Sequence, residues 1–164
     1  MTGGTARQHR PDPGTNQLVV FTLGDRRYGL PVAAVDRVVR AVDVTSLPKA
    51  PEIVLGVVNV QGRVIAVVNV RRRFRLPEHE IALTDQMVIA RTTRRTVALM
   101  VDAVAGVLKY SEQEAVAAHD VLPELQYVDG VVKLDDGLIL IHDLDRFLSL
   151  EEEAGLNRAL ETDS

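Results

Sequence analysis

The sequence is dominated by short aliphatic runs that occur in pairs, with a brief polar turn between the two members of each pair. The clearest pair is residues 53–60 and 63–70, which are separated only by Gln61 and Gly62. Glycine readily adopts the positive φ that a two-residue hairpin turn requires. The many valines and isoleucines, branched at Cβ, favour extended backbone. We therefore predict a tight β-hairpin over this segment.

The same pattern recurs along the chain and predicts further hairpins. The additional pairs are residues 18–23 with 26–30, 86–91 with 96–101, and 127–134 with 138–141, and residues 104–110 add another strand. Aromatic residues make up only 4% of the chain, so aliphatic side chains must fill the core. We expect about nine or ten short strands, in a mainly β fold of small antiparallel barrels with short helices.

Two short helices are expected in the first half of the chain. Pro31 can occupy the first position of a helix whose apolar stripe would be Val32, Val35 and Val39. The β-branched residues around Val39 favour extended backbone, so this helix must be short. A polar, helical turn is predicted over residues 71–75.

Capping residues predict two more helices in the second half. Ser111 and Glu114 have the spacing of a capping box, which indicates a short helix. Asp143 is expected to cap a helix over residues 144–148, and Ser149 can extend or restart it. A C-terminal helix therefore follows the last strand.

The predicted domain organisation is one folded unit between two tails. Residues 1–16 are rich in glycine and proline and are expected to be a disordered tail. Residues 17–150 form the folded domain, with a boundary between two barrel subdomains near the polar segment 76–86. Residues 151–164 are expected to be a helical or disordered tail.

Residue types and motifs that commonly carry catalysis are sparse in this sequence. The chain has no cysteine, which excludes disulfides, thiolate metal sites and a cysteine nucleophile. No phosphate loop, nucleophile elbow or zinc-protease motif occurs. The four histidines are scattered, and none forms a close pair with another: His9, His79, His119 and His142. We expect no enzymatic activity, no metal and no cofactor; an enzyme whose site is assembled from distant segments is a rival hypothesis.

Two arginine-rich segments require a separate interpretation. Residues 71–75 read Arg-Arg-Arg-Phe-Arg, and the second cluster is Arg91, Arg94 and Arg95. Three interpretations are possible for these segments. They are a solvated cationic helix opposite acidic residues, a docking patch for an acidic protein, and a nucleic-acid-binding barrel. A formal net charge of −4 and the single nearby aromatic, Phe74, argue against nucleic acid.

No segment predicts a membrane span or a signal peptide. The longest apolar stretch, residues 53–70, is interrupted by Arg63 and Asn69, and the N-terminus lacks an apolar run. Together with the absence of cysteine, this favours a cytoplasmic protein without direct membrane insertion.

Several short segments occur in an order and spacing that are hard to obtain by chance. They are Val20-Phe21-Thr22-Leu23-Gly24-Asp25, Tyr28-Gly29-Leu30 with Val35, Gly56-Val57-Val58-Asn59 with Gly62, Val67-Val68 with Arg71 and Phe74, Val101-Asp102-Ala103-Val104 with Val107-Leu108, Tyr127 with Gly130, and Leu138-Ile139-Leu140-Ile141. This series resembles the CheW-like domains of chemotaxis coupling proteins, over residues 18–148. The resemblance implies two five-stranded, SH3-like barrels packed around a shared hydrophobic interface.

The resemblance also implies a function. Members of this family are non-catalytic adaptors that bind the regulatory domain of a CheA-type histidine kinase and the cytoplasmic tip of chemoreceptors, and other CheW-like domains are a further class of partner. The residues expected to face the receptor are Val35, Arg37, Val38, Val39, Asn59, Gln61, Gly62 and Val64. Those expected to face the kinase are Leu30, Ala33, Val97 and Ala98.

The sequence departs from the family pattern where partners are usually recognised. A hairpin that commonly reads Asn-Leu-Arg-Gly is Asn-Val-Gln-Gly here, so Gln61 replaces an arginine. Arg37 stands at a usually acidic position, Val39 near it at a usually basic one, and the usual Val-Asp-Leu-Arg is here Val-Asn-Val-Arg at 68–71. These changes alter charge and hydrogen-bonding geometry. They leave two alternatives: partners adapted to a divergent or non-flagellar pathway, or an adaptor that has lost one interface.

Overall fold

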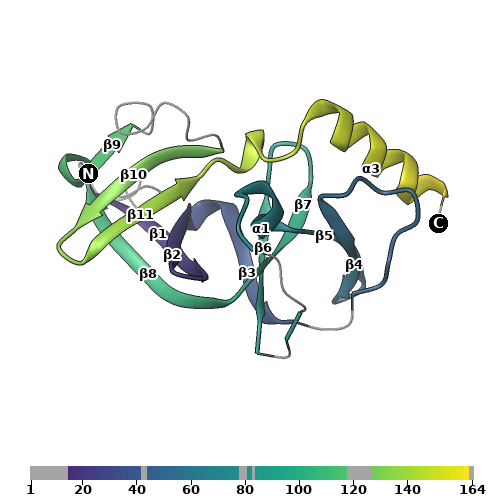
Figure 1. Ribbon diagram of the computed structural model, residues 1–164, viewed down its shortest axis with the longest axis horizontal. Helices are drawn as coiled ribbons and strands as arrows, with labels where there is room; N and C mark the ends of the chain where they lie inside the picture. Colours follow the sequence, from purple (N-terminus) through teal and green to yellow (C-terminus); the bar gives the residue numbers. More distant parts are fainter. Residues whose placement is uncertain (1–14, 42–43, 78–80, 83, 118–126, 163–164) are drawn as a thin grey trace, which may run out of the picture.

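The computed structural model describes residues 15–41, 44–77, 81–82, 84–117 and 127–162. Within these residues the strands form two sheets, one of six strands and one of five, which lie side by side in Figure 1. The six-stranded sheet contains β1 (Thr15–Leu23), β2 (Arg26–Pro31), β8 (Ala103–Ser111), β9 (Ala115–Ala117), β10 (Val128–Leu134) and β11 (Gly137–His142). The five-stranded sheet contains β3 (Val35–Arg40), β4 (Val54–Val60), β5 (Arg63–Val68), β6 (Gln86–Arg91) and β7 (Thr96–Val101).

All the hairpins expected from the aliphatic pairs are present, and the mainly β prediction is confirmed. The helical elements are short except the last: η2 (Val32–Ala34), α1 (Val70–Arg73), η3 (Glu112–Glu114), η4 (Leu144–Arg146) and α3 (Leu150–Thr162). The capping box at Ser111 is formed, and Asp143 accepts a hydrogen bond from the Arg146 N–H. One of the two sheets has a sixth strand, the three-residue β9, beyond the five that were expected.

The helix predicted after Pro31 is wrong beyond its first turn. Only η2 is helical, and the chain becomes the strand β3 at Val35. The apolar spacing of Val32, Val35 and Val39 suggested a helix, but β-branched residues favour the extended backbone that pairing with β6 provides. Of the expected N-terminal tail, residues 1–14 lie outside the described residues, while Thr15 and Asn16 already belong to β1.

The expected subdomain boundary near 76–86 does not separate the two sheets. Strands β3 to β7, which are consecutive in the chain, all belong to the five-stranded sheet. The six-stranded sheet is assembled from β1 and β2 before this unit and β8 to β11 after it. The chain therefore changes sheet after Pro31 and again between Val101 and Ala103.

The two sheets share one plan. In each, two antiparallel hairpins are joined by a parallel pair: β2 with β11, where Tyr28 opposes Leu140, and β7 with β5, where Val97 opposes Ala66. The bulges also correspond. The bulge at Val20/Phe21, where β1 pairs with β8, matches that at Val35/Arg37, where β3 pairs with β6. The bulge at Val128/Gly130, where β10 pairs with β11, matches that at Val54/Gly56, where β4 pairs with β5. Residues at matching register positions are called equivalent below.

Three groups of buried apolar side chains hold this arrangement together. The five-stranded sheet encloses Ala41, Val58, Ile65, Val67, Met87, Ile89, Ala98 and Met100, and the six-stranded sheet encloses Leu18, Val20, Val132, Ile139 and Ile141. The largest group joins both sheets to α3 and includes Phe21, Tyr28, Val68, Leu99, Phe147 and Leu156. Because this shared core is larger than either inner core, the sheets are expected to unfold together.

Candidate partner-binding surface and the cleft between the sheets

The residues expected to face the receptor all lie on the five-stranded sheet, but they do not share one face. Val35 and Val38 oppose Ala90 and Val88, which belong to the shared core. Arg37 and Val39 oppose Ile89 and Met87 of the inner core. Successive side chains of a strand point to opposite faces, so the predicted set is divided between the outside of the sheet and its inner side.

Exposure further separates this set. Val38 is 37% exposed and Val64 is 64% exposed, so both offer apolar surface to a partner. Val35 and Val39 are half-buried and pack against the shared core and the inner core respectively. Arg37 is exposed. Val38 and Val64 are therefore the apolar members of the set that are available for docking.

The β4–β5 turn positions the polar members of the set. Gln61 and Gly62 have φ values of 51° and 84°, so both are left-handed, as a type I′ hairpin turn requires. The Asn59 side-chain oxygen accepts a hydrogen bond from the Gly62 N–H at 2.8 Å. Asn59 thus has a structural role in the turn, while Gln61 is exposed at its tip.

An ion pair links this hairpin to β3. Arg63, at the start of β5, lies 3.9 Å from Asp36 and donates a hydrogen bond of 3.2 Å to Thr96 on β7. The pair is solvent-exposed and at the distance limit, so its contribution to stability is small. It shows that the turn and β3, at opposite edges of the sheet order, approach each other.

The residues expected to face the kinase are mostly buried, which corrects that prediction. Leu30, Val97 and Ala98 are at most 1% exposed and belong to the cores, so their side chains have no surface for a partner. Only Ala33 is exposed, and its carbonyl accepts a hydrogen bond from Arg91 at 3.1 Å. Sequence alone did not separate these apolar residues from surface ones, because strands buried on both faces do not alternate.

The arginine-rich segment at 71–75 is largely occupied by internal ion pairs. Arg71 reaches both carboxylate oxygens of Asp102 at 2.6 and 2.7 Å, and Asp102 also accepts the Gly24 N–H at 2.7 Å. Arg72 lies 3.2 Å from Glu52, and Arg73 forms a hydrogen bond with Glu152 of α3. The α1 helix therefore links both sheets and α3, which sequence reasoning missed.

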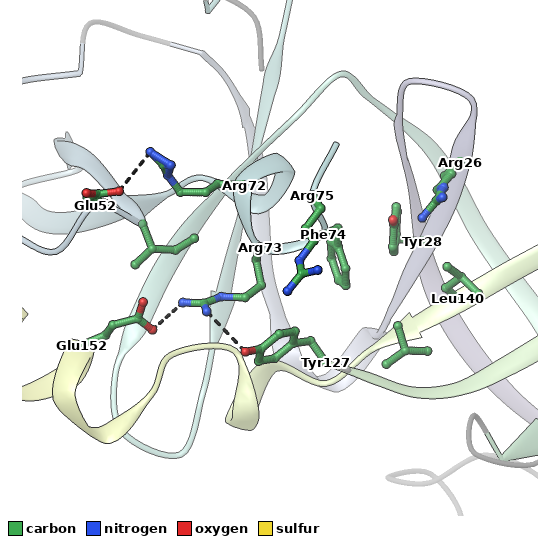
Figure 2. A pocket seen from close by; sticks show the side chains of 12 residues that line it. Arg26, Tyr28, Glu52, Arg72, Arg73, Phe74, Arg75, Tyr127, Leu140 and Glu152 are labelled. Atoms are coloured by element: carbon green, nitrogen blue, oxygen red, sulfur yellow. Dashed lines mark hydrogen bonds and ion pairs between the residues drawn. The ribbon is translucent and has the colours of Figure 1, made fainter. Parts of the chain in front are cut away.

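A cleft of about 480 Å³ opens beside α1, between the two sheets (Figure 2). Tyr28 forms part of its wall: the ring stacks on Phe74 with centroids 4.5 Å apart. The Tyr28 hydroxyl is buried and has no hydrogen-bond partner among the described residues. Burial raises the pKa of Tyr28, and the neighbouring Arg26 opposes part of that rise.

Arg73 occupies the centre of this wall. Its guanidinium lies 5.0 Å from the Tyr127 ring centroid and 5.5 Å from that of Phe147, within range of cation–π attraction. Burial alone would lower the pKa of Arg73, but the hydrogen bond and charge of Glu152 raise it above its usual value. The pKa of Glu152 is lowered in turn, because Arg73 outweighs the effect of burial.

His142 is the one histidine among the described residues, and it lies in the core. Its ring lies 5.0 Å from Phe74 and 4.9 Å from Phe147, and neither ring nitrogen has a hydrogen-bond partner within the described part of the chain. Burial lowers the pKa of His142 to about 3, so the side chain is neutral at physiological pH. The other histidines, His9, His79 and His119, lie outside the described residues.

The residues that the structure describes contain neither a cluster of metal ligands nor a membrane-spanning helix. No group of three or more histidine, cysteine, aspartate or glutamate side chains is placed to hold a metal ion there. Over the same residues, no helix is both long and apolar enough to cross a bilayer.

Comparison with known proteins places this fold and sequence in a family. The chain is 28% identical over 142 residues to the chemotaxis protein CheW of Treponema pallidum, covering 83% of this chain and 84% of that protein. It is 28% identical over 141 residues to the chemotaxis protein CheW of Rhizobium meliloti, covering 85% and 91% respectively.

The structure is similar to the crystal structure of the scaffolding protein TtCheW from Thermoanaerobacter tengcongensis, with a TM-score of 0.76 and 28% identity. That similarity covers 84% of this chain and 94% of TtCheW, and it agrees with the expected pair of SH3-like units. Residues 17–152 match the family model of the CheW-like domain. This match spans most of the chain, so the protein belongs to the CheW-like domain family.

Proposed function

We propose that this protein is a non-catalytic adaptor of a chemotaxis pathway, which couples the cytoplasmic tips of chemoreceptors to the regulatory domain of a CheA-type histidine kinase. The observation that carries this proposal is the family match over residues 17–152 together with the similarity to a CheW scaffolding protein. The adaptor would act in the cytoplasm, at membrane-associated receptor arrays, and would also contact other CheW-like domains.

For the receptor interface, the proposal centres on the exposed outer face of the five-stranded sheet. Val38 and Val64 supply exposed aliphatic surface, and Gln61 and Gly62 form the adjoining turn. Exposed apolar side chains that desolvate on docking supply affinity, while polar neighbours fix the register. For the kinase interface, Ala33 is the member of the expected set that stays exposed.

The direct test is binding of the purified chain to receptor cytoplasmic fragments and to the kinase regulatory domain from the same organism. Saturable binding to both is the expected result. Binding to neither would refute the coupling role and leave the fold unaffected. Binding to one alone would identify the chain as an adaptor that has lost an interface, the alternative raised by Arg37 and Gln61.

A charge placed on the proposed surface gives a sharper test. Val64→Asp would carry a carboxylate into the interface and should weaken receptor binding at least about tenfold, since burying an unpaired charge is costly. Leu138→Asp is a matched control: Leu138 is the equivalent residue on β11 and is 48% exposed. Both variants should keep the wild-type melting temperature; equal weakening by the two would contradict the assignment of the surface.

A further inference from the structure

The cleft beside α1 has a surplus of positive charge. Four guanidinium groups and two carboxylates are among its lining groups, and the carboxylates are already paired, Glu52 with Arg72 and Glu152 with Arg73. The remaining two arginines, Arg26 and Arg75, form no ion pair with any carboxylate among the described residues. Two guanidinium groups therefore line one cleft without a counter-charge from the described part of the chain (Figure 2).

In the five-stranded sheet, the arginine equivalent to Arg26 is paired with a carboxylate. Arg95 is equivalent to Arg26. Arg95 lies two residues before Val97, the first residue of β7 that pairs with β5, and Arg26 lies two residues before Tyr28, the first residue of β2 that pairs with β11. Arg95 donates a hydrogen bond of 2.7 Å to Glu153 of α3, and both side chains are largely buried. Arg26 has no such helix against it, and none of the described carboxylates forms an ion pair with it, so the position is open to an anion from outside the described residues.

The cleft also contains donors that are not used. The Tyr28 hydroxyl and the Arg73 Nε are buried and have no hydrogen-bond partner among the described residues. An unsatisfied buried donor costs free energy that an acceptor in the cleft would recover. Guanidinium forks match the oxygens of phosphate and carboxylate groups, and the two unpaired charges match a dianion better than a single carboxylate.

We propose that the cleft between the two sheets binds a phosphate dianion, either free or carried as the monoester of a small molecule, through Arg26 and Arg75. A phosphate monoester carries close to two negative charges at neutral pH and offers acceptors on three oxygens. The volume of about 480 Å³ lies within the range of small-ligand sites. This binding is separate from the adaptor surface, which lies on other residues.

The test is a calorimetric titration of the full chain with inorganic phosphate and with glycerol phosphate, against acetate at the same ionic strength. Saturable binding with a dissociation constant below about 1 mM is expected for at least one phosphate compound but not for acetate. Tighter binding of the ester would indicate a carried phosphate, and tighter binding of the inorganic ion a free one. A response to acetate equal to that of phosphate, or no saturation by either phosphate compound, would overturn the proposal.

Two variants locate the site. Arg26→Gln and Arg75→Gly should each weaken phosphate binding at least about fivefold, because each removes a charged donor pair. Arg75 has a φ of 58° directly after Phe74, the C-cap of α1, where glycine is favoured, so Arg75→Gly should not lower the melting temperature. Arg94→Gln, at an exposed position in the β6–β7 turn, is the control with the same charge loss. Unchanged affinity in both cleft variants, or an equal loss in the control, would refute the assignment.

Discussion

The two sheets have the same strand plan but differ in what their equivalent residues contact. Arg95, just before β7 of the five-stranded sheet, is largely buried against Glu153 of α3, whereas Arg26 of the six-stranded sheet is exposed. His142 is equivalent to Val68, and both are buried in the shared core. The strand pattern therefore sets the backbone plan, while the elements packed against each sheet decide the chemistry of its side chains.

The largest expected difference between the sheets concerns two equivalent bulge glycines. A Cβ at Gly56 would lie 2.2 Å from the Thr45 carbonyl oxygen, and Gly56 has a φ of 154°. A Cβ at Gly130 would meet the Val116 carbonyl oxygen at 3.1 Å, which a small shift can relieve. Gly56→Ala should therefore cost about 3 kcal/mol or more of unfolding free energy, and Gly130→Ala about 1 kcal/mol.

Urea denaturation of both alanine variants at neutral pH measures these costs. The wild-type chain is the reference, and a substitution at the exposed Gly24 is the control that separates steric clash from left-handed strain. At Gly24 a Cβ meets no atom within 4 Å, but φ is 60°. Equal costs at Gly56 and Gly130 would show that the two bulges are not distinguished by their neighbours.

The two equivalent arginines should differ in their effect on stability. Arg95→Ala leaves the largely buried Glu153 carboxylate without its ion pair, so we expect a loss of about 2 kcal/mol. Arg26→Ala removes an exposed side chain and should change the unfolding free energy by less than about 0.5 kcal/mol. Melting curves of the two variants check this; a similar loss in both would mean that Arg26 has an internal partner after all.

The third contrast is between His142 and Val68, and it is a contrast in pH dependence. The unfolded chain protonates His142 below its ordinary pKa of 6.5, while the folded chain does so only below about 3. The stabilising effect is therefore complete above pH 6.5 and is lost progressively as pH falls towards 3. By pH 5 the loss attributable to this residue should be about 2 kcal/mol relative to pH 7.5.

Replacement by the nonionisable His142→Leu isolates this effect. The variant should lose less stability than the wild type between pH 7.5 and pH 5, by about that amount, in denaturant titrations at the two values. Parallel pH profiles for the two proteins would show that His142 is accessible to protons in the folded state.

The local features of the fold were predictable from the sequence, but the features that depend on distant partners were not. The Gln61–Gly62 turn and the Asp143 cap follow from neighbouring residues, so they were predicted correctly. The short helix predicted after Pro31 was extended into the start of β3, because the pairing of β3 with β6 involves residues some fifty positions away. The boundary at 76–86 was wrong for the same reason: which sheet a strand joins depends on long-range pairing.

The candidate site shows the same division. Val64 is exposed, whereas the burial of Leu30 and Val97 depends on the packing of one sheet against the other. The basic run at 71–75 was visible in the sequence, but its carboxylate partners, such as Asp102 and Glu152, lie far along the chain. Their pairing could not be deduced from spacing alone.

The nesting of one sheet inside the sequence of the other has a consequence for synthesis on the ribosome. Strands β3 to β7 are complete once residue 101 has emerged, so the five-stranded unit can begin to form early. The hairpin of β1 with β2 is made before β3 to β7 but finds its remaining neighbours only when β8 and β11 follow, up to His142. These two strands, although they precede β3 to β7 in the sequence, are thus among the last to be enclosed, and their apolar residues stay open to chaperones or to wrong pairing in the interval.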